Sequence, residues 1–443
     1  MLRNIPFPVL PAPPSWYPGH MTQFTRMLPT ILRRTDVVLE LRDARLPLTS
    51  INRNFEGALH KWRLERAGPK LASGLHSVVT NKTLAARTYG ATCERIVVFN
   101  KRDLVSEWGI EPFRKAMANK YPDQTVFFAS WNHRQDVKRL SNLLVALDLM
   151  IGMVDMCETD IAKQSPHAPE MNVLVVGMPN VGKSTLLNAL RSTGISGPTA
   201  KALRTSAQPG MTRALSTRLK LCEDPLVYSF DSPGVMLPFL GRGDRGAERG
   251  VKLALIAGIK EGLYDTESLA AYLLYRFNIL DPMAPAYLTL LPEGAQPTAD
   301  IYEFLDTLAR RLSMIKRGGI PDQTRAAVWF VNWWREQGSR LSASAPLLAG
   351  NSLLSDTSYT QRRGWGFDFE WSVERSEMEN YDEKVIQRKM ENCIEVFEAE
   401  AKQEEEEGET VSSTQEKKKA REHLITKRMA RSKARLAARK GNS

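Results

Sequence analysis

The chain has 443 residues, long enough for two or three domains, and its apolar fraction of 42% and charged fraction of 25% are those of a globular protein. Its four cysteines lie far apart without any CxxC pair, which argues against a disulfide framework and against a zinc site. The net charge of +11 is concentrated at the C-terminal end, because residues 416–443 hold eleven Lys or Arg against two Glu and the rest sums to about +2.

The N-terminal segment has the charge bias of a mitochondrial presequence, with four arginines and no acidic residue in the first 35 positions. Five prolines between positions 6 and 14 would break an amphipathic helix, so we expect only a short presequence, residues 1–14. A Pro/Gly-rich loop, PSWYPGHM (14–21), comes next and is followed by a predicted helix through MTQFTRMLPTILRRT.

Strands alternating with helices are predicted from residue 36 onward, which indicates an α/β domain over 15–244 with a mostly parallel sheet. The predicted strands are 36–47, 96–99, 125–130, 171–176 and a pair within 218–235, and the predicted helices are 111–120 and 136–157. The most apolar stretch, 143–154, contains Asp148 and is too short to cross a bilayer, so no transmembrane segment is predicted.

Residues 56–95 mix basic and small residues without a clear period, and we predict an insertion there. It would be a surface loop, a lineage-specific contact or retained non-coding sequence. The pattern becomes helical over 245–340, where tryptophans at 329, 333 and 334 have a spacing that favours core packing over base stacking. From 341 to 443 we expect a low-order extension, in which an acidic run, Glu404 to Glu407, precedes the basic tail.

The segment GMPNVGKST (177–185) fits the P-loop pattern G-x-x-x-x-G-K-[ST] and lies between a predicted strand and a predicted helix. Its backbone N–H groups and the helix N-terminus would hold phosphates, Lys183 would reach the β- and γ-phosphates, and Ser184 would bind Mg²⁺. The predicted nucleotide-binding residues of this loop are Asn180, Val181, Gly182, Lys183, Ser184 and Thr185.

A second phosphate-sensing motif, DSPG, begins at Asp231, at the end of an apolar strand. Its carboxylate would hold Mg²⁺ through water, and the N–H of Gly234 would sense the γ-phosphate. Between the two motifs, QPGMTR (208–213) offers Thr212 as a further Mg²⁺ ligand in the triphosphate state.

The segment IVVFNKRDL (96–104) has the form of a strand that ends in a guanine-binding motif, Asn-Lys-x-Asp. Guanine presents N1–H and N2–H₂ as adjacent donors, so the carboxylate of Asp103 would select it over adenine. Asn100 would brace the loop and the base, and Lys101 would lie along the ring. A similar segment, SVVTNKTL (77–84), has Leu84 in place of the aspartate and cannot select guanine.

This guanine-binding motif precedes the P-loop, the reverse of the usual order, and no second copy follows Asp231 at a suitable distance. After it, the strand TVFFAS ends where a loop backing the base is expected, with Ala129 and Ser130 as the contacts. The order therefore predicts a circularly permuted P-loop GTPase domain, since permutation moves only the chain ends and keeps the site. Without the guanine-binding motif, the alternative is a P-loop ATPase or kinase.

The motifs WYPGHM, DVVLELRDARLPLTS, NKRDL, GMPNVGKSTLLN, PGMT and DSPGVMLP resemble the YlqF/RbgA family of circularly permuted ribosome-assembly GTPases, whose eukaryotic members are mitochondrial ribosome-associated GTPases. The resemblance spans about residues 15–340 and includes the helical region, which is similar to the small all-helical C-terminal domain of the family. It implies GTP and GDP as ligands, with the large ribosomal subunit and its rRNA as partners. The resemblance also implies that the protein is located in the mitochondrial matrix, and we further expect a peripheral contact with the inner membrane.

Two residue roles are implied by this resemblance alone. The position after DSPG, a water-orienting glutamine in Ras-like enzymes, is Val235, and the family is thought to use the histidine of PGHM instead, here His20. The alternative for His20 is a packed turn or an RNA contact. Asn180 matches the asparagine that potassium-stimulated GTPases use as a K⁺ ligand, and its alternative is an ordinary loop asparagine.

We therefore expect a GTPase that acts in maturation of the large mitochondrial ribosomal subunit, with hydrolysis accelerated by that subunit. The alternative is a nucleotide-gated rRNA-binding scaffold with negligible catalysis, which the missing glutamine motivates. The basic tail would bind rRNA phosphates or would be a solvated extension.

Overall fold

The computed structural model describes residues 5–14, 16–67, 94–122, 124–158, 170–205, 215, 218–237, 239–344, 361–374, 377 and 382–406. Within these ranges a six-stranded sheet has the order β3-β2-β1-β4-β6-β5. The strands are β1 (Val37–Asp43), β2 (Glu94–Asn100), β3 (Thr125–Phe128), β4 (Met171–Gly177), β5 (Leu219–Cys222) and β6 (Val227–Asp231). All neighbouring pairs are parallel except β5 with β6, which agrees with the prediction of a mostly parallel sheet.

The register of the parallel strands brings the predicted motifs to one edge of the sheet. Asp43, the last residue of β1, pairs with Asn100, and Leu41 pairs with Gly177, the first residue of the P-loop. On the other side of β4, Val175 pairs with Asp231. Because the carboxyl ends of parallel strands meet at the same edge, motifs that are far apart in the chain become neighbours there.

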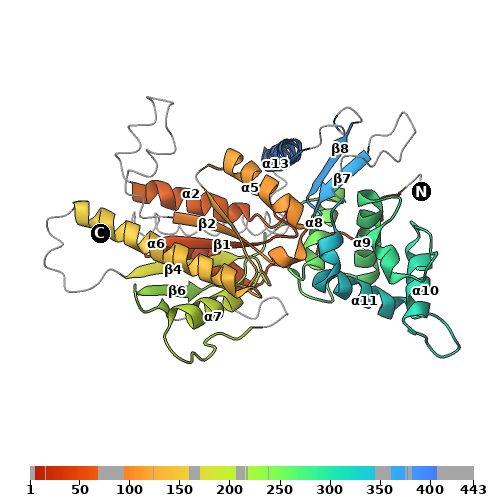
Figure 1. Cartoon of the computed structure of the whole chain (residues 1–443), viewed down its shortest axis with the longest axis horizontal. Helices are drawn as coiled ribbons and strands as arrows, with labels where there is room; N and C mark the ends of the chain where they lie inside the picture. The colour runs from red at the N-terminus through yellow and green to blue at the C-terminus, as the bar shows by residue number, and fades with distance from the viewer. Residues whose placement is uncertain are drawn as a thin grey trace, which may run out of the picture.

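Helices cover both faces of this sheet (Figure 1). They are α1 (Gly19–Leu32), α2 (Arg53–Ala67), α5 (Ile110–Lys120), α6 (Arg134–Glu158) and α7 (Lys183–Gly194). Side chains alternate along β2, so its two faces contribute to two different cores. Val97 and Phe99 pack with Phe113 of α5, whereas Ile96 and Val98 belong to the larger core that includes α6 and α7.

Helix α2 overlaps the start of the predicted insertion at 56–95, whose limits stay a prediction. Its Phe55, Leu59 and Trp62 are buried in the larger core, so residues 56–67 are part of the domain. Glu56 also joins a buried ion network, because Arg95 and Arg42 donate to it from β2 and β1. Of the predicted insertion, residues 68–93 lie outside the described part of the chain.

The charged network explains why β1 can be buried along its whole length and still contain Glu40 and Arg42. Burial alone would raise the pKa of Glu40, but Arg42 and Arg95 lower it to about 2. A buried carboxylate that is paired in this way stays ionised, and losing either arginine would leave its charge only partly compensated.

A helical region follows the sheet, as predicted, and consists of α8 (Gly243–Leu255), α9 (Thr266–Leu280), α10 (Ile301–Arg311) and α11 (Gln323–Glu336) (Figure 1). Trp334 is buried, and Trp329 and Trp333 are half-buried against the same core. These three side chains pack within the protein, as their spacing in the sequence predicted. The domain boundary near 244/245 stays a prediction.

The expectation of low order beyond residue 341 is wrong for two segments. A hairpin forms from β7 (Gln361–Trp365) and β8 (Phe369–Val373), and a long helix, α13 (Glu383–Glu406), lies along α5 (Figure 1). Met390 and Ile394 of α13 are buried in the smaller core with Phe113. The acidic side chains of α13 pair with α5 and with α8, for example Glu395 with Lys120 and Glu404 with Arg249.

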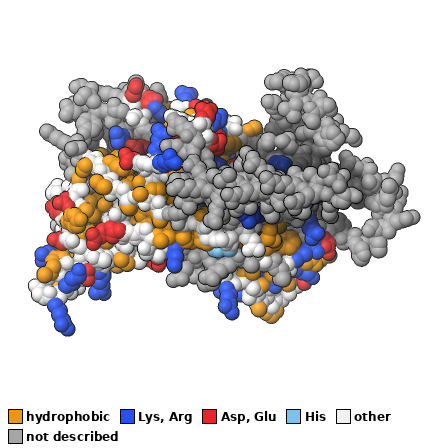
Figure 2. Space-filling view, turned by 180° about the vertical axis from the view of Figure 1, so that it is seen from behind, with side chains coloured by type: hydrophobic (Ala, Val, Ile, Leu, Met, Phe, Trp, Pro, Cys, Tyr) orange, Lys and Arg blue, Asp and Glu red, His pale blue; other side chains and the backbone are white. Residues whose placement is uncertain are grey.

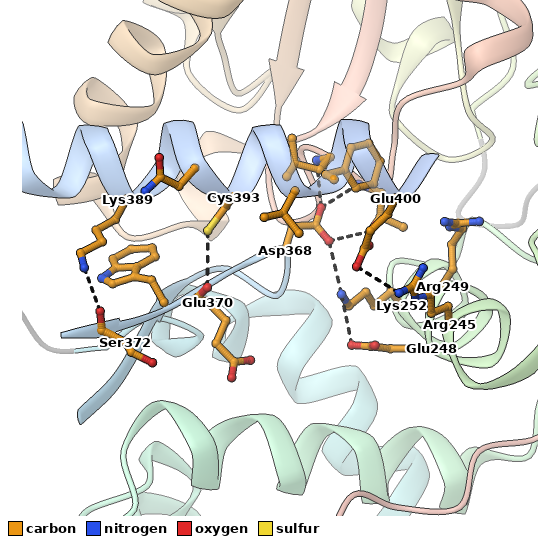
Figure 3. Close-up of a pocket in the computed structure, with 16 residues that line it drawn as sticks. Arg245, Glu248, Arg249, Lys252, Asp368, Glu370, Ser372, Lys389, Cys393 and Glu400 are labelled. Atoms are coloured by element: carbon orange, nitrogen blue, oxygen red, sulfur yellow. Dashed lines mark hydrogen bonds and ion pairs between the residues drawn. The ribbon is translucent and has the colours of Figure 1, made fainter. Parts of the chain in front are cut away.

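Asp368, in the turn of this hairpin, fixes the hairpin to the loop after β1. Its carboxylate accepts from the backbone N–H groups of Leu48 and Thr49 at 2.9 and 2.8 Å and from the Thr49 hydroxyl at 2.5 Å. Lys252 of α8 lies 3.6 Å from the same carboxylate, beside a pocket of about 520 Å³ between α8, β8 and α13 (Figure 3). The hairpin and α13 thus join the sheet domain to the helical region.

Within the described residues, no helix has both the length and the apolar character that crossing a membrane requires.

Candidate nucleotide-binding site

The P-loop runs from the end of β4 into α7 and has the backbone of a tight phosphate-binding turn. Gly182 has φ +94°, and a Cβ on Gly177 would lie 2.3 Å from the carbonyl oxygen of Leu41, so both positions require glycine. Asn180 also has a positive φ of 59°, which is uncommon for a residue with a side chain. Val181 is buried beneath the loop, and Thr185 is exposed in the first turn of α7.

Lys183 lies under this loop, where its ammonium group donates to the carbonyls of Met178 at 2.8 Å and Gly177 at 3.2 Å. Burial lowers its pKa to about 8, although the charge of Asp231 acts in the opposite direction. A phosphate at this loop would restore the charged form, because an anion beside an ammonium group raises its pKa.

Ser184 and Asp231 come together although 47 residues separate them. The Ser184 hydroxyl donates to the Asp231 carboxylate at 2.8 Å. A hydroxyl and a carboxylate side by side are the oxygen donors that Mg²⁺ prefers, so the pair fits the metal that a GTPase requires. Bound there, Mg²⁺ would neutralise charge on the phosphates.

The DSPG segment follows Asp231 and lies directly against the P-loop. A Cβ on Gly234 would lie 2.6 Å from the backbone of Pro179, so only glycine allows this approach. The next residue, Val235, is buried and donates its N–H to the Gly177 carbonyl at 3.2 Å. A buried valine cannot orient a water molecule, so any water-orienting group must come from another position.

The guanine-binding motif lies beside the P-loop. The side-chain nitrogen of Asn100 donates to the carbonyl of Val181 at 2.6 Å. Lys101 has a left-handed backbone with φ 63°, and its ammonium group binds the Asp43 carboxylate at 2.9 Å. Among the described residues nothing donates to the carboxylate of Asp103, so this acid is available to a ligand.

Asp136, which the sequence reasoning did not single out, connects the guanine-binding motif to the base-backing loop. Its buried carboxylate accepts from Arg102 Nε at 2.6 Å and from the backbone N–H of Ser130 at 3.0 Å. The backbone N–H of Ala129 donates to the Phe99 carbonyl at 2.9 Å, which places Ala129 and Ser130 beside the motif. Asp136 follows Ser130 by only six residues, yet no motif marks it.

Three predicted residues remain: Asn180, His20 and Thr212. The side-chain nitrogen of Asn180 donates to the Ala257 carbonyl, after α8, at 2.9 Å, so the P-loop touches the helical region. His20 is half-buried in the first turn of α1. Thr212 lies outside the described residues.

Known proteins resemble this chain at the sequence level. A family model described as 50S ribosome-binding GTPase matches residues 172–272. Mitochondrial ribosome-associated GTPase 1 of Xenopus tropicalis is 30% identical over 304 residues, which cover 68% of this chain and 81% of that protein. The chain belongs to the mitochondrial ribosome-associated GTPase family.

A second sequence relative agrees with this assignment. Mitochondrial GTPase 1 of Schizosaccharomyces pombe is 28% identical over 319 residues, which cover 70% of this chain and 83% of that protein. A crystal structure of GNP-bound YlqF from T. maritima aligns with a TM-score of 0.40 at 18% identity and covers 72% of this chain and 94% of that one.

In this mitochondrial ribosome-associated GTPase, the position of the family match shows the order of the motifs along the chain. The matched segment begins in β4 and ends in α9, so it contains the P-loop and DSPG but not Asn100 to Asp103. The guanine-binding motif comes earlier in the chain and still lies beside the P-loop. The predicted fold, a circularly permuted GTPase domain, is confirmed, and so is the prediction that the protein is a GTPase.

Proposed function

We propose that this GTPase acts in mitochondria as an assembly factor for the large ribosomal subunit and so supports mitochondrial translation. The GTP state would favour binding to the subunit, and hydrolysis would release the factor. The observation that carries the proposal is the joining of the guanine-binding motif and the P-loop into one site through Asn100 and Val181. The relatives' names, which link them to mitochondria and to the ribosome, supply the partner.

The surface of the helical region supports binding to a large polyanion. Basic side chains are exposed at the end of α10, in the loop after it and on α11: Arg310, Arg311, Lys316, Arg317 and Arg325. Figure 2 shows Lys and Arg side chains projecting from the lower edge of one face. Such side chains neutralise RNA phosphates and release counterions, which makes binding sensitive to salt. The basic tail, 416–443, lies outside the described residues.

Within the site we assign the guanine base to Asp103, Asn100 and Lys101, with Ala129 and Ser130 behind it. The phosphates lie on residues 180–185 and Gly234, and Mg²⁺ on Ser184 and Asp231, with Thr212 as a further ligand. K⁺ at Asn180 and water orientation by His20 complete the proposal. The proposal also includes a location in the mitochondrial matrix and a peripheral contact with the inner membrane.

A nucleotide-gated scaffold with negligible catalysis is the second candidate, because Val235 is buried where a catalytic glutamine would stand. Multiple-turnover GTPase assays with and without large subunits separate the two functions. Turnover that large subunits accelerate supports the assembly GTPase, whereas nucleotide-dependent binding without turnover supports the scaffold.

The decisive experiment exchanges the base that the protein recognises. In xanthine a carbonyl replaces the N2 amino group of guanine, so Asp103→Asn should transfer recognition from GTP to XTP by offering an amide donor. Wild-type protein should co-sediment with large subunits in a non-hydrolysable GTP analogue, and D103N only in the matching XTP analogue. Subunit binding that is the same with every nucleotide and with both proteins would overturn the proposal.

A further inference from the structure

Trp131 brings an indole N–H to the junction of the base-backing loop and the P-loop. A Cβ built on Gly182 would lie 2.9 Å from Trp131 Nε1 and 2.7 Å from the side-chain nitrogen of Asn100. Two nitrogen donors from separate strand ends therefore lie over the same glycine of the P-loop. Gly182 has no side chain that would separate them from this loop.

The indole N–H is buried, and no acceptor within the described chain lies at hydrogen-bonding distance from it. Buried N–H groups in folded proteins nearly always have a partner, because burial without one costs the group its hydration. An orphaned donor inside a ligand site is therefore explained when the ligand itself supplies the acceptor.

The position of Trp131 is fixed by the turn that carries it. The Ser130 N–H is bound by Asp136 at 3.0 Å, and the N–H of His133 donates to the Ser130 carbonyl at 2.9 Å, which closes a turn just before α6. On the other side, Ala129 is hydrogen-bonded to Phe99, one residue before Asn100. The side chain between these anchors is held beside Asn100 and the P-loop.

Guanine has an edge that matches this donor. Asp103 can satisfy only the N1–H and N2–H₂ donors, whereas the adjoining edge of the base carries two acceptors, O6 and N7. Adenine has an amino donor where guanine has O6, so a protein N–H placed at that edge favours guanine. The Asn100 amide already donates one of its two hydrogens to the Val181 carbonyl. A second donor from the protein can therefore serve this edge of the base.

We propose that the Trp131 indole N–H donates to O6, on the O6/N7 edge of guanine, and is a specificity-determining contact, an inference that rests on the guanine site proposed above. Asp103 then recognises the donor edge of the base and Trp131 the acceptor edge. The same indole packs on Gly182, so the contact also ties the base to the phosphate-binding loop.

The test compares Trp131→Phe, which keeps an aromatic ring and removes the N–H, with the wild type. GDP should bind W131F about three- to tenfold more weakly, the range for loss of one hydrogen bond, while weak ADP binding should not change. Two analogues test which atom accepts: 7-deaza-GDP lacks N7 and 6-thio-GDP weakens the acceptor at position 6. The affinity penalty of 6-thio-GDP seen in the wild type should shrink in W131F, whereas the penalty of 7-deaza-GDP should stay the same.

Trp108→Phe is the matched control, because Trp108 packs on the separate core around α5 and should leave both penalties unchanged. A second measurement uses NMR: the wild-type indole N–H resonance that is absent in Trp131→Tyr should shift downfield on addition of GDP. GDP affinity of W131F equal to the wild type, or a loss with unchanged analogue penalties, would overturn the inference. Guanine preference that survives Asp103→Asn would instead overturn the guanine site itself.

Discussion

Asn100 donates a 2.6 Å hydrogen bond to the carbonyl of Val181, 81 residues further along the chain. This bond joins the strand end that we propose selects the base to the loop that we propose holds the phosphates. Because both groups sit at the same edge of a parallel sheet, their contact does not depend on which strand comes first in the chain. The permuted order of the domain therefore leaves one continuous site.

The guanine-binding motif and the base-backing loop should weaken together when Asp136 is changed. Asp136→Asn removes the charge that holds Arg102 and weakens the bond to the Ser130 N–H. We expect GDP affinity to fall on the order of tenfold, as for a charge-assisted hydrogen bond, measured by fluorescent-nucleotide titration. Asp265→Asn, at the N-cap of α9, is the control and should leave affinity unchanged. Wild-type affinity in D136N would contradict this coupling.

Nucleotide affinity should fall as pH rises above about 8. Burial lowers the pKa of Lys183 to about 8, so at higher pH the free protein carries mostly the neutral amine. Phosphates bind the ammonium form and raise its pKa, so binding must take up a proton, and affinity should fall by up to about tenfold per pH unit.

Calorimetry at pH 8.5 in two buffers of different ionisation enthalpy should show this proton uptake. Lys183→Arg, whose guanidinium stays charged, should bind GDP with no proton uptake in the same titrations. Equal proton uptake by K183R would assign the titration to another group.

A role of His20 in orienting water predicts a loss in turnover without a loss in binding. His20→Ala should keep GDP affinity and lose on the order of a hundredfold in GTP hydrolysis stimulated by large subunits. His20→Gln can still hydrogen-bond water and should retain more of the stimulated rate than H20A. Stimulated turnover of H20A equal to the wild type would remove His20 from the mechanism.

A K⁺ ligand at Asn180 predicts faster GTP hydrolysis in KCl than in NaCl. The side-chain nitrogen donates to Ala257, so the amide oxygen is the atom that suits a cation. Asn180→Asp keeps an oxygen and should keep the KCl stimulation, whereas Asn180→Leu should lose it. The same KCl to NaCl ratio in both variants would argue that Asn180 serves only its contact with Ala257.

Asp368 should be a large contributor to stability. Asp368→Ala leaves two buried backbone N–H groups and the Thr49 hydroxyl without their acceptor. We expect the free energy of unfolding to drop by about 2–4 kcal/mol, measured by denaturant titration. Glu383→Gln breaks the exposed pair with Lys115 and should leave the free energy of unfolding unchanged within measurement error. Equal effects of the two changes would contradict the stabilising role of Asp368.

The local parts of this protein were predictable from its sequence. The strands that lead into Asn100, Gly177 and Asp231 are short apolar runs that end in glycine or polar side chains. Glycine is required at Gly177 and Gly182 because of backbone geometry within a few residues. The order of the three motifs was enough to predict the permutation.

The tertiary structure decided what depends on partners distant in sequence. Glu56 looked like part of an unpatterned insertion because its arginine partners lie on β1 and β2. The acidic residues of α13 were predicted to be solvated, but in the structure they pair with basic residues of α5 and α8. Asp136 and Trp131 carry no motif, and only the packing of two strand ends places them in the site. Local pattern fixes the backbone of each loop, whereas the charge and donor balance of a buried site is set by whichever strands the fold brings together.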